Sequence, residues 1–252
     1  MAAGFGVHHE WGKLRKAIVA DVPGLSDVLR QEGVQVHSVA TLSPRDPLIV
    51  VGRRFIESSV RPGSRRREHL ALQPTVRQLA QHYGVEWSYV PPGSPDGVDG
   101  PYLEGGDVLL NGYEVYVGMS GQASDMAGID WLEVRLGPAY RVIPIAMRSS
   151  VLHLDDVLAL VRPGLLICCP SLLIDGLPEA LRDWDPITAL PEETSRNVAQ
   201  ILVLEPGRAV VAARSTRIAE ELRLHGIEVI SLTCDIGLRS AHQPLWRESV
   251  LE

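Results

Sequence analysis

Cysteine is scarce in this chain of 252 residues, which contains only Cys168, Cys169 and Cys234. Two of the three are adjacent and poorly placed to bridge one another, and the number is odd. A disulfide framework of the secreted kind is therefore not expected, and a reducing cytoplasm is the expected location. Cys168 and Cys169 follow an apolar run, so we expect them to behave as small buried hydrophobes.

Excess positive charge and long apolar runs are also missing. The chain has 24 basic and 31 acidic residues, a net charge of −7 and a pI near 5.6. Nucleic acids and anionic membranes attract basic surfaces, so neither is expected as a partner. No run approaches the roughly 18 apolar residues that span a bilayer. The first ten residues lack the basic and apolar regions of a signal peptide, so none is expected.

Short apolar runs alternate with stretches of helical periodicity, which predicts an α/β fold. The length fits one large domain, and we expect a single domain over residues 1–252. A long loop is expected at residues 91–101, and a linker between two domains is the alternative interpretation. Strands are expected near 17–20, 47–51, 85–90, 108–110, 115–117, 141–145, 165–168, 201–204, 209–212 and 227–232, and helices near 72–83, 126–136 and 216–225.

Two carboxylates flank a pair of glycines just before one of the expected strands. Glu104 and Asp107 enclose Gly105 and Gly106. The glycines would permit positive φ angles and leave room for a ligand. A carboxylate about 4 Å from a guanidinium contributes about 4 kcal/mol at an effective dielectric of 20, so the pair predicts a cation site. A glycine turn with solvated acids is the alternative.

Further candidate groups lie at two other points of the chain. His153 and Asp155 alternate along a segment expected to be extended, so both would point to one face. A histidine there could move protons, or it could be a hydrogen-bonded core residue. No cluster of His, Cys and Glu completes a metal-ligand set, so no metal is expected. Asp46 beside Arg45 could bond a guanidinium edge. The arginine-rich run at 61–68 is expected to be a solvated face.

Several segments, in their order, resemble the amidinotransferases of the glycine and inosamine-phosphate type, within the guanidino-modifying superfamily. These segments are residues 9–19, 44–52, 56–68, 128–142 and 153–164. The resemblance covers nearly the whole chain and implies the pentein fold. In this five-bladed α/β propeller, ββαβ units surround a pseudo-fivefold axis, and the substrate lies in the central channel.

The resemblance also implies a mechanism and a role for each candidate residue. In the family, a cysteine thiolate attacks the guanidino carbon of arginine, and the amidino group then passes to an amine or to water. His153 matches the general acid and base, and Asp107 matches its carboxylate partner. Asp46 and Asp155 match carboxylates that grip the guanidinium, with Arg45 and Glu104 beside them. No cofactor is implied, the ligand is a small guanidino or amino compound, and a homodimer is compatible with the family.

The end of the chain departs from the family pattern. His242 matches a family histidine, but Gln243 stands where the nucleophilic cysteine belongs. Ser171, Leu172 and Leu173 replace an arginine that often clamps a substrate carboxylate in the family.

Three interpretations remain open. The chain could be a diverged enzyme with altered chemistry, a pseudoenzyme that binds or scaffolds, or an active enzyme using Cys234 as a displaced nucleophile. Cys234 is followed by Asp235, whose charge would raise the thiol pKa and disfavour the thiolate.

Overall fold

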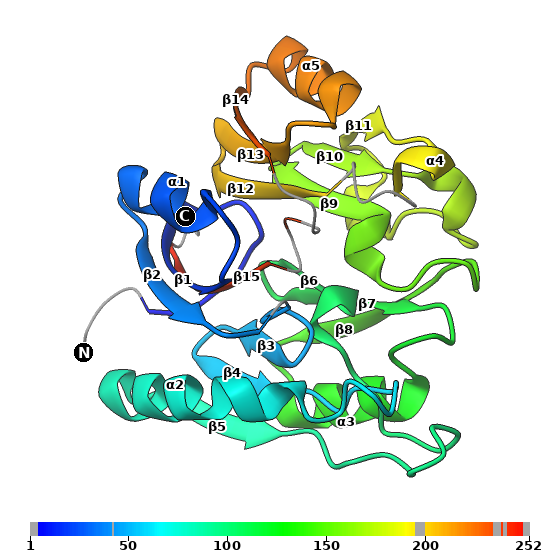
Figure 1. Cartoon of the computed structure of the whole chain (residues 1–252). Coiled ribbons are helices and arrows are strands. Elements are labelled where there is room, and N and C mark those ends of the chain that lie inside the picture. Colours follow the sequence, from blue (N-terminus) through cyan, green and yellow to red (C-terminus); the bar gives the residue numbers. More distant parts are fainter. Residues whose placement is uncertain (1–4, 42, 195–199, 234–237, 239–240, 249–252) are drawn as a thin grey trace.

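The computed structural model describes residues 5–41, 43–194, 200–233, 238 and 241–248. Over these residues, fifteen strands form five separate sheets of three strands each. Figure 1 shows the sheets arranged in a ring, with the helices at its outside. The part of the chain that the structure describes contains no helix long and apolar enough to cross a membrane.

One strand pattern recurs in the sheets. In the sheet of β3 (Leu48–Val51), β4 (Arg54–Glu57) and β5 (Glu86–Tyr89), the first two strands are antiparallel and the last two are parallel. Parallel strands need a crossover connection, and helix α2 (Glu68–Tyr83) supplies it here. The same order recurs in β6 (Val108–Asn111), β7 (Glu114–Met119), α3 (Met126–Leu136) and β8 (Arg141–Ala146), and in β12 (Ile201–Glu205), β13 (Arg208–Ala212), α5 (Thr216–Leu224) and β14 (Glu228–Leu232).

Two units vary this pattern. Strands β9 (Leu158–Arg162), β10 (Leu165–Cys168) and β11 (Asp185–Thr188) form a unit whose crossover contains two 3₁₀ turns, Pro170–Leu172 and Glu179–Leu181. The last unit combines segments from far apart in the sequence. In it, β15 (His242–Arg247) pairs antiparallel with β1 (Leu14–Ala20), which pairs parallel with β2 (Gln35–Val39) after helix α1 (Leu25–Gln31). The five strand units expected from the resemblance are therefore present.

All ten expected strands are found, with ends that differ by at most three residues. Five strands escaped the sequence analysis: β2, β4, β9, β11 and β15. Two of them lack the apolar signal, because β2 buries only Val39 and β11 buries only Ile187. A strand of which one residue is buried carries too little pattern to stand out from a loop.

The three expected helices are present as α2, α3 and α5. Pro74 was expected to begin or kink the first, but α2 begins six residues earlier, at Glu68. The missing N–H of Pro74 costs little there, because the carbonyl four residues back belongs to Leu70, which is exposed and can bond water. Ser215 stands at the N-cap of α5 as expected, although its hydroxyl makes no capping hydrogen bond.

The loop expected at residues 91–101 lies at the surface and is fastened to the β3–β5 unit. The Tyr102 hydroxyl donates to the carbonyl of Ser94 at 2.7 Å, and Arg66 Nη1 donates to the carbonyl of Pro95 at 2.9 Å. The N–H of Gly93 donates to Ser59 Oγ at 3.2 Å. The loop therefore delivers the chain to Glu104 along a defined path.

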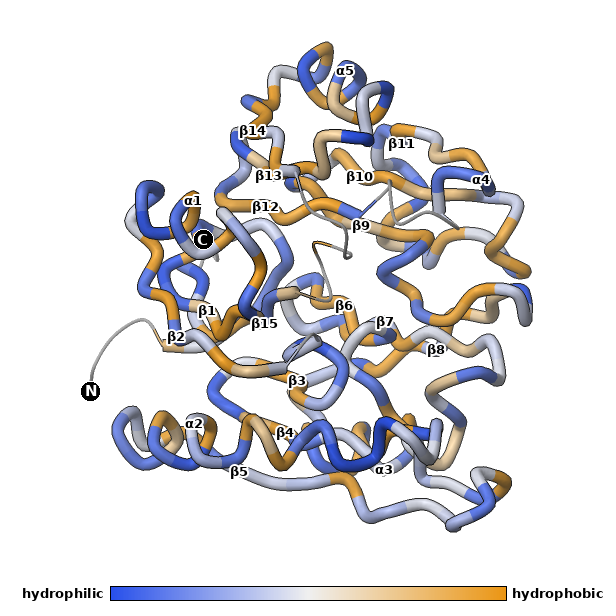
Figure 2. Tube along the Cα trace, in the orientation of Figure 1, coloured by the Kyte–Doolittle hydropathy of each residue, from blue (hydrophilic) through white to orange (hydrophobic). Residues whose placement is uncertain are grey.

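The core consists of apolar side chains between the sheets and their helices. Figure 2 shows the apolar stretches concentrated on the strands, with polar stretches on the outer turns and helices. Leu154 and Val157 belong to the largest buried cluster, in which Leu109 and Tyr116 also lie. Because Leu154 is fully buried, the turn that carries His153 has little freedom to move away from the ring centre.

Candidate functional site

The fold places equivalent positions of different units around one cavity. In four of the five units a polar residue lies one or two positions before the first strand: Asp46 before β3, Asp107 before β6, Asp156 before β9 and Gln200 before β12. Asp46, Asp156 and Gln200 line the same cavity of about 560 Å³. Their convergence follows from the pseudo-fivefold repetition of the ββαβ unit. Gln200 was missed by the sequence analysis, although its position just before an expected strand is the signal that could have found it.

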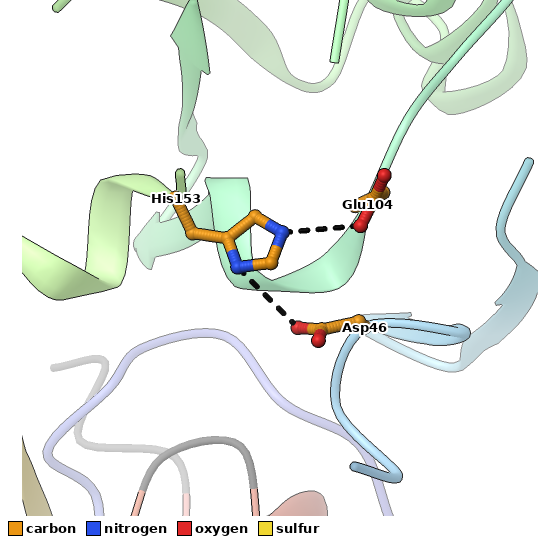
Figure 3. A group of neighbouring side chains, drawn as sticks. All are labelled: Asp46, Glu104 and His153. Atoms are coloured by element: carbon orange, nitrogen blue, oxygen red, sulfur yellow. Dashed lines mark hydrogen bonds and ion pairs between the residues drawn. The ribbon is translucent and has the colours of Figure 1, made fainter. Parts of the chain in front are cut away.

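His153 lies between two carboxylates of other units. Its Nε2 is 3.1 Å from Glu104 Oε2, and its Nδ1 is 3.8 Å from Asp46 Oδ1 (Figure 3). Burial alone would lower the pKa of His153, but the charge of Asp46 and the hydrogen bond to Glu104 outweigh it and hold the pKa well above its usual value. The imidazolium is therefore the stable form, and it can donate a proton from either nitrogen.

The local backbone around His153 differs from the extended segment that the sequence predicted. Leu154–Asp156 form a 3₁₀ turn, and the backbone N–H of His153 donates to Asp156 Oδ2 at 3.1 Å. As a result, His153 and Asp155 do not share one face of a strand. His153 lines the cavity, whereas Asp155 is buried against Arg45.

Asp107 holds the backbone of the site together. Its Oδ2 accepts the N–H of Ser124 at 3.1 Å, and its Oδ1 accepts the N–H of Leu154 at 3.0 Å. Burial raises its pKa to about 7, against the lowering effect of His153 and these hydrogen bonds. The resemblance made Asp107 the carboxylate that partners the histidine and the substrate; in the structure the carboxylate within hydrogen-bond distance of the His153 ring is that of Glu104, and Asp107 bonds the backbone of Leu154.

The two glycines between these acids are needed for space. Neither adopts a positive φ, contrary to the conformational role expected from the sequence. A Cβ on Gly105 would lie 2.0 Å from the carbonyl oxygen of Arg45. A Cβ on Gly106 would lie 2.7 Å from His153 Cγ and 2.9 Å from Asp46 Oδ1. The glycines thus allow three units to meet closely enough for their polar groups to bond.

Arg45 and Asp155 form a buried ion pair. Arg45 Nε donates to Asp155 Oδ2 at 3.0 Å, its Nη2 donates to the carbonyl of Val108 at 3.1 Å, and Nη2 is 3.7 Å from Glu10 Oε2. Neither Arg45 nor Asp155 lines the 560 Å³ cavity. Both were expected to bind the ligand, and the structure instead uses them to bond to each other.

Arg65 enters the acidic cluster. The run at residues 61–68 was expected to be a solvated face, but Arg65 Nη2 donates to Asp46 Oδ2 at 2.7 Å. Its Nη1 lies 3.5 Å from Glu104 Oε2, and the guanidinium also bonds Glu68. No local pattern in the sequence distinguishes Arg65 from the neighbouring arginines of this run, so its inward orientation could not be predicted.

His242 and Gln243 lie on β15. His242 Nδ1 is 2.7 Å from the carbonyl of Leu238, and Gln243 Nε2 donates to the carbonyl of Pro244 at 3.3 Å. Gln243 is buried, and it lines a void of about 10 Å³ together with Arg45. Neither His242 nor Gln243 is among the described residues that line the 560 Å³ cavity.

The cysteines divide into two groups. Cys168 and Cys169 are free and buried, and burial raises the pKa of Cys168 to about 11, so its thiolate is disfavoured. Cys234, the candidate displaced nucleophile, lies outside the described residues. Leu172 lines the cavity on the segment where the family arginine was missing, so this part of the wall is apolar.

Three residues are close enough to share a metal ion. One ligand atom each from Asp46, Glu104 and His153 lies within 4.8 Å of the others. The sequence predicted no metal set, because these residues come from three separate units and no local spacing connects them. Arg65 already bonds both carboxylates, so an ion would have to compete with its guanidinium.

Known proteins resemble this chain in sequence. No family model matches the chain. The protein named inosamine-phosphate amidinotransferase 2 of Streptomyces griseus is 31% identical over 218 residues, which cover 76% of this chain and 62% of that protein. Inosamine-phosphate amidinotransferase 1 of Streptomyces griseus is 26% identical over 254 residues, covering 85% and 72%. The chain thus spans less than two thirds of the length of the first of these relatives.

Solved structures agree in fold. An inosamine-phosphate amidinotransferase of Streptomyces griseus superimposes with a TM-score of 0.87 at 22% identity, over 98% of both chains. DDAH of Pseudomonas aeruginosa gives a TM-score of 0.71 at 19% identity, over 92% of this chain and 99% of that one.

The five three-stranded sheets and these structural matches define the pentein fold. The homologues of the chain include inosamine-phosphate and glycine amidinotransferases.

Proposed function

We propose that the cavity binds a guanidino, amidino or related amino compound and acts on it without a cysteine at position 243. The observation that carries the proposal is the meeting of Asp46, Glu104 and His153 beside the cavity, in a chain whose homologues are amidinotransferases. We place this function in the cytoplasm, where the buried thiols of Cys168 and Cys169 would stay reduced.

The charges of the site support a cationic ligand. Burial acts to raise the pKa of Asp46, but the charges of His153 and Arg65 outweigh it and hold the pKa below its usual value. Asp46 is therefore ionised at neutral pH. Among the residues that the structure describes, the buried Oδ1 of Asp46 has no hydrogen-bond partner, and neither has the buried Oε1 of Gln200. Both atoms accept hydrogen bonds, so a ligand that carries several N–H donors would satisfy them.

The chemistry proposed for His153 is proton donation. Attack of water or an acceptor amine on the guanidino carbon forms a bond at carbon and releases a proton from the attacking group, for which the ionised carboxylate of Asp46 is the proposed acceptor. The departing nitrogen must gain a proton as its bond to carbon breaks. The imidazolium of His153 is a proton donor at neutral pH, and Glu104 fixes its ring at 3.1 Å. Direct attack by the acceptor would replace the covalent cysteine step of the family.

Product analysis tests this proposal. The protein is incubated with arginine and acceptor amines, ornithine is measured, and intact mass is recorded for an amidino adduct. We expect ornithine without an adduct, and its loss in His153→Gln and Asp46→Asn. His82→Gln, which changes an exposed histidine at the end of α2, is the matched control and should keep full activity.

Other outcomes would contradict the proposal in different ways. An adduct that disappears in Cys234→Ala would show that a cysteine performs the attack. Arginine binding without ornithine would refute the chemistry and leave a binding protein. Absence of both binding and turnover with arginine, agmatine and methylguanidinium would refute the proposed function as a whole.

A further inference from the structure

A guanidinium group of the protein itself lies at the centre of the acidic cluster. Arg65 Nη2 donates to Asp46 Oδ2 at 2.7 Å, and Nη1 lies 3.5 Å from Glu104 Oε2. Asp46 and Glu104 are almost fully buried, whereas 23% of the Arg65 side chain is exposed. Arg65 therefore enters from the cavity side and reaches the carboxylates with its planar end.

Arg65 makes the contacts that a ligand guanidinium would need. A guanidinium presents its N–H donors in one plane, and Arg65 bridges the two carboxylates with its two terminal nitrogens, Nη2 at Asp46 and Nη1 at Glu104. With Arg65 in place, the two anions Asp46 and Glu104 face two cations, Arg65 and the His153 imidazolium. A third cation added to this group would meet like charges at short range. A ligand guanidinium therefore has to replace Arg65 in order to bind there.

The structure provides a partner that Arg65 can keep when it leaves the acids. Glu68, in the first turn of α2, accepts from Arg65 Nε and Nη2, both at 2.9 Å. The Arg65 and Glu68 side chains are 23% and 29% exposed, so this pair is partly accessible to solvent. Rotation of Arg65 toward solvent could preserve the pair with Glu68 while freeing Asp46 and Glu104.

We propose that Arg65 occupies the guanidinium subsite of the cavity and acts as a specificity-determining residue that a ligand guanidinium must displace. This inference rests on the proposed function, because it assumes that the cavity binds a guanidino compound. Only a ligand with a planar set of N–H donors can replace the hydrogen bonds that Arg65 gives up. An ammonium ligand, which is a point charge, replaces them poorly and is selected against.

Calorimetric titration with methylguanidinium tests the inference, because this probe fills the subsite and little else. The apparent affinity of the wild-type protein is reduced by the fraction of molecules in which Arg65 holds the acids. We expect Arg65→Gln to bind methylguanidinium at least about tenfold more tightly than the wild type. Arg65→Lys, which retains the charge but not the fork, should show a smaller gain.

Two controls accompany this measurement. Arg67→Gln removes an exposed arginine two residues along the same run and should leave the affinity unchanged. Methylammonium has the same charge as methylguanidinium without its planar donors, and the wild type should bind it more weakly. Thermal unfolding of each variant establishes that it is folded. If Arg65→Gln is not folded, the comparison is made with Arg65→Lys.

The outcomes separate this inference from the proposed function. Equal or weaker binding of methylguanidinium by the Arg65 variants would overturn the inference. The proposed function would survive that result if Asp46→Asn still abolished binding. Absence of guanidino-compound binding in every variant would overturn the proposed function and the inference with it. Phosphate binding lost in Arg65→Gln would also overturn the inference, since Arg65 would then be an anion-binding group.

Discussion

Replacement of Arg45 by methionine tests whether the buried Arg45–Asp155 pair is structural or ligand-binding. Methionine keeps an unbranched side chain, shorter than that of arginine, and removes the charge. It would leave Asp155 and Glu10, which lie 3.0 Å and 3.7 Å from the guanidinium, without this cation. It would also remove the hydrogen bond from Nη2 to the carbonyl of Val108. The change therefore removes one interaction from each of two acids and from one backbone carbonyl.

The expected cost is large because all of these groups are buried. Side-chain exposure is 4% for Arg45 and 3% for Asp155, and removal of one partner of a buried ion pair costs about 3–5 kcal/mol. For a domain of this size, such a loss lowers the midpoint of thermal unfolding by roughly 6–20 °C. Asp155→Asn should cost less, because its amide oxygen can still accept from Arg45 Nε and Glu10 remains nearby.

Thermal and urea unfolding, followed by circular dichroism, measure these differences. Arg30→Met is the matched control, because Arg30 pairs with Asp27 at 3.4 Å on the surface. Its loss should change stability by about 0.5 kcal/mol or less. An Arg45→Met protein that melts within about 2 °C of the wild type but no longer binds arginine would refute the reasoning. Arg45 and Asp155 would then belong to the ligand site, as the sequence predicted.

Two further predictions concern the cavity wall. Gly106→Ala should weaken methylguanidinium binding about tenfold or more in calorimetric titration, because its Cβ would displace His153 and Asp46. Gly63→Ala is the control, because its Cβ would have open space, and it should bind as the wild type does. Equal affinity in both variants would contradict the packing argument. Burial raises the pKa of Asp156 from 3.8 to about 6, so the folded state holds this proton more tightly than the unfolded state does. As pH rises through this range, ionisation of Asp156 should lower the free energy of unfolding by at most about 3 kcal/mol. Urea unfolding between pH 4 and 7 should show a shallower decline in Asp156→Asn, and parallel pH profiles would contradict it.

Burial on both faces made some strands recognisable from the sequence, but it did not decide every case. Strand β9 is a continuous buried run over residues 158–161 and was missed, whereas β14 buries only Leu232 and was found. Residues 108–110 and 209–212 are continuous buried runs, and each was recognised as a strand. Strands β2 and β11 also bury one residue each and were missed, and hydrogen bonding to their neighbours reveals them. The ring arrangement came from the resemblance to the amidinotransferases, because strand periodicity carries no information about which sheets lie side by side.

The site was predictable in its members more than in its pairings. Asp46 and His153 were expected at the ligand, and both line the cavity. The sequence could not show that Arg45 bonds Asp155 or that Arg65 bonds Asp46, because these pairs join residues up to 110 positions apart. Which buried charge meets which is decided by packing at the scale of single ångströms, and that scale is absent from sequence patterns.

The pairing of β15 with β1 has a consequence for how the protein forms during translation. Four sheets are built from contiguous stretches and can assemble as each stretch leaves the ribosome, but β1 must wait for β15. At 5–20 residues per second, the wait from Leu14 to His242 lasts roughly ten to forty-five seconds. During that time β1 presents an open edge to other nascent chains. A polypeptide that ends before residue 242 would therefore leave the edge of β1 unpaired, and such fragments should aggregate more readily than the complete chain.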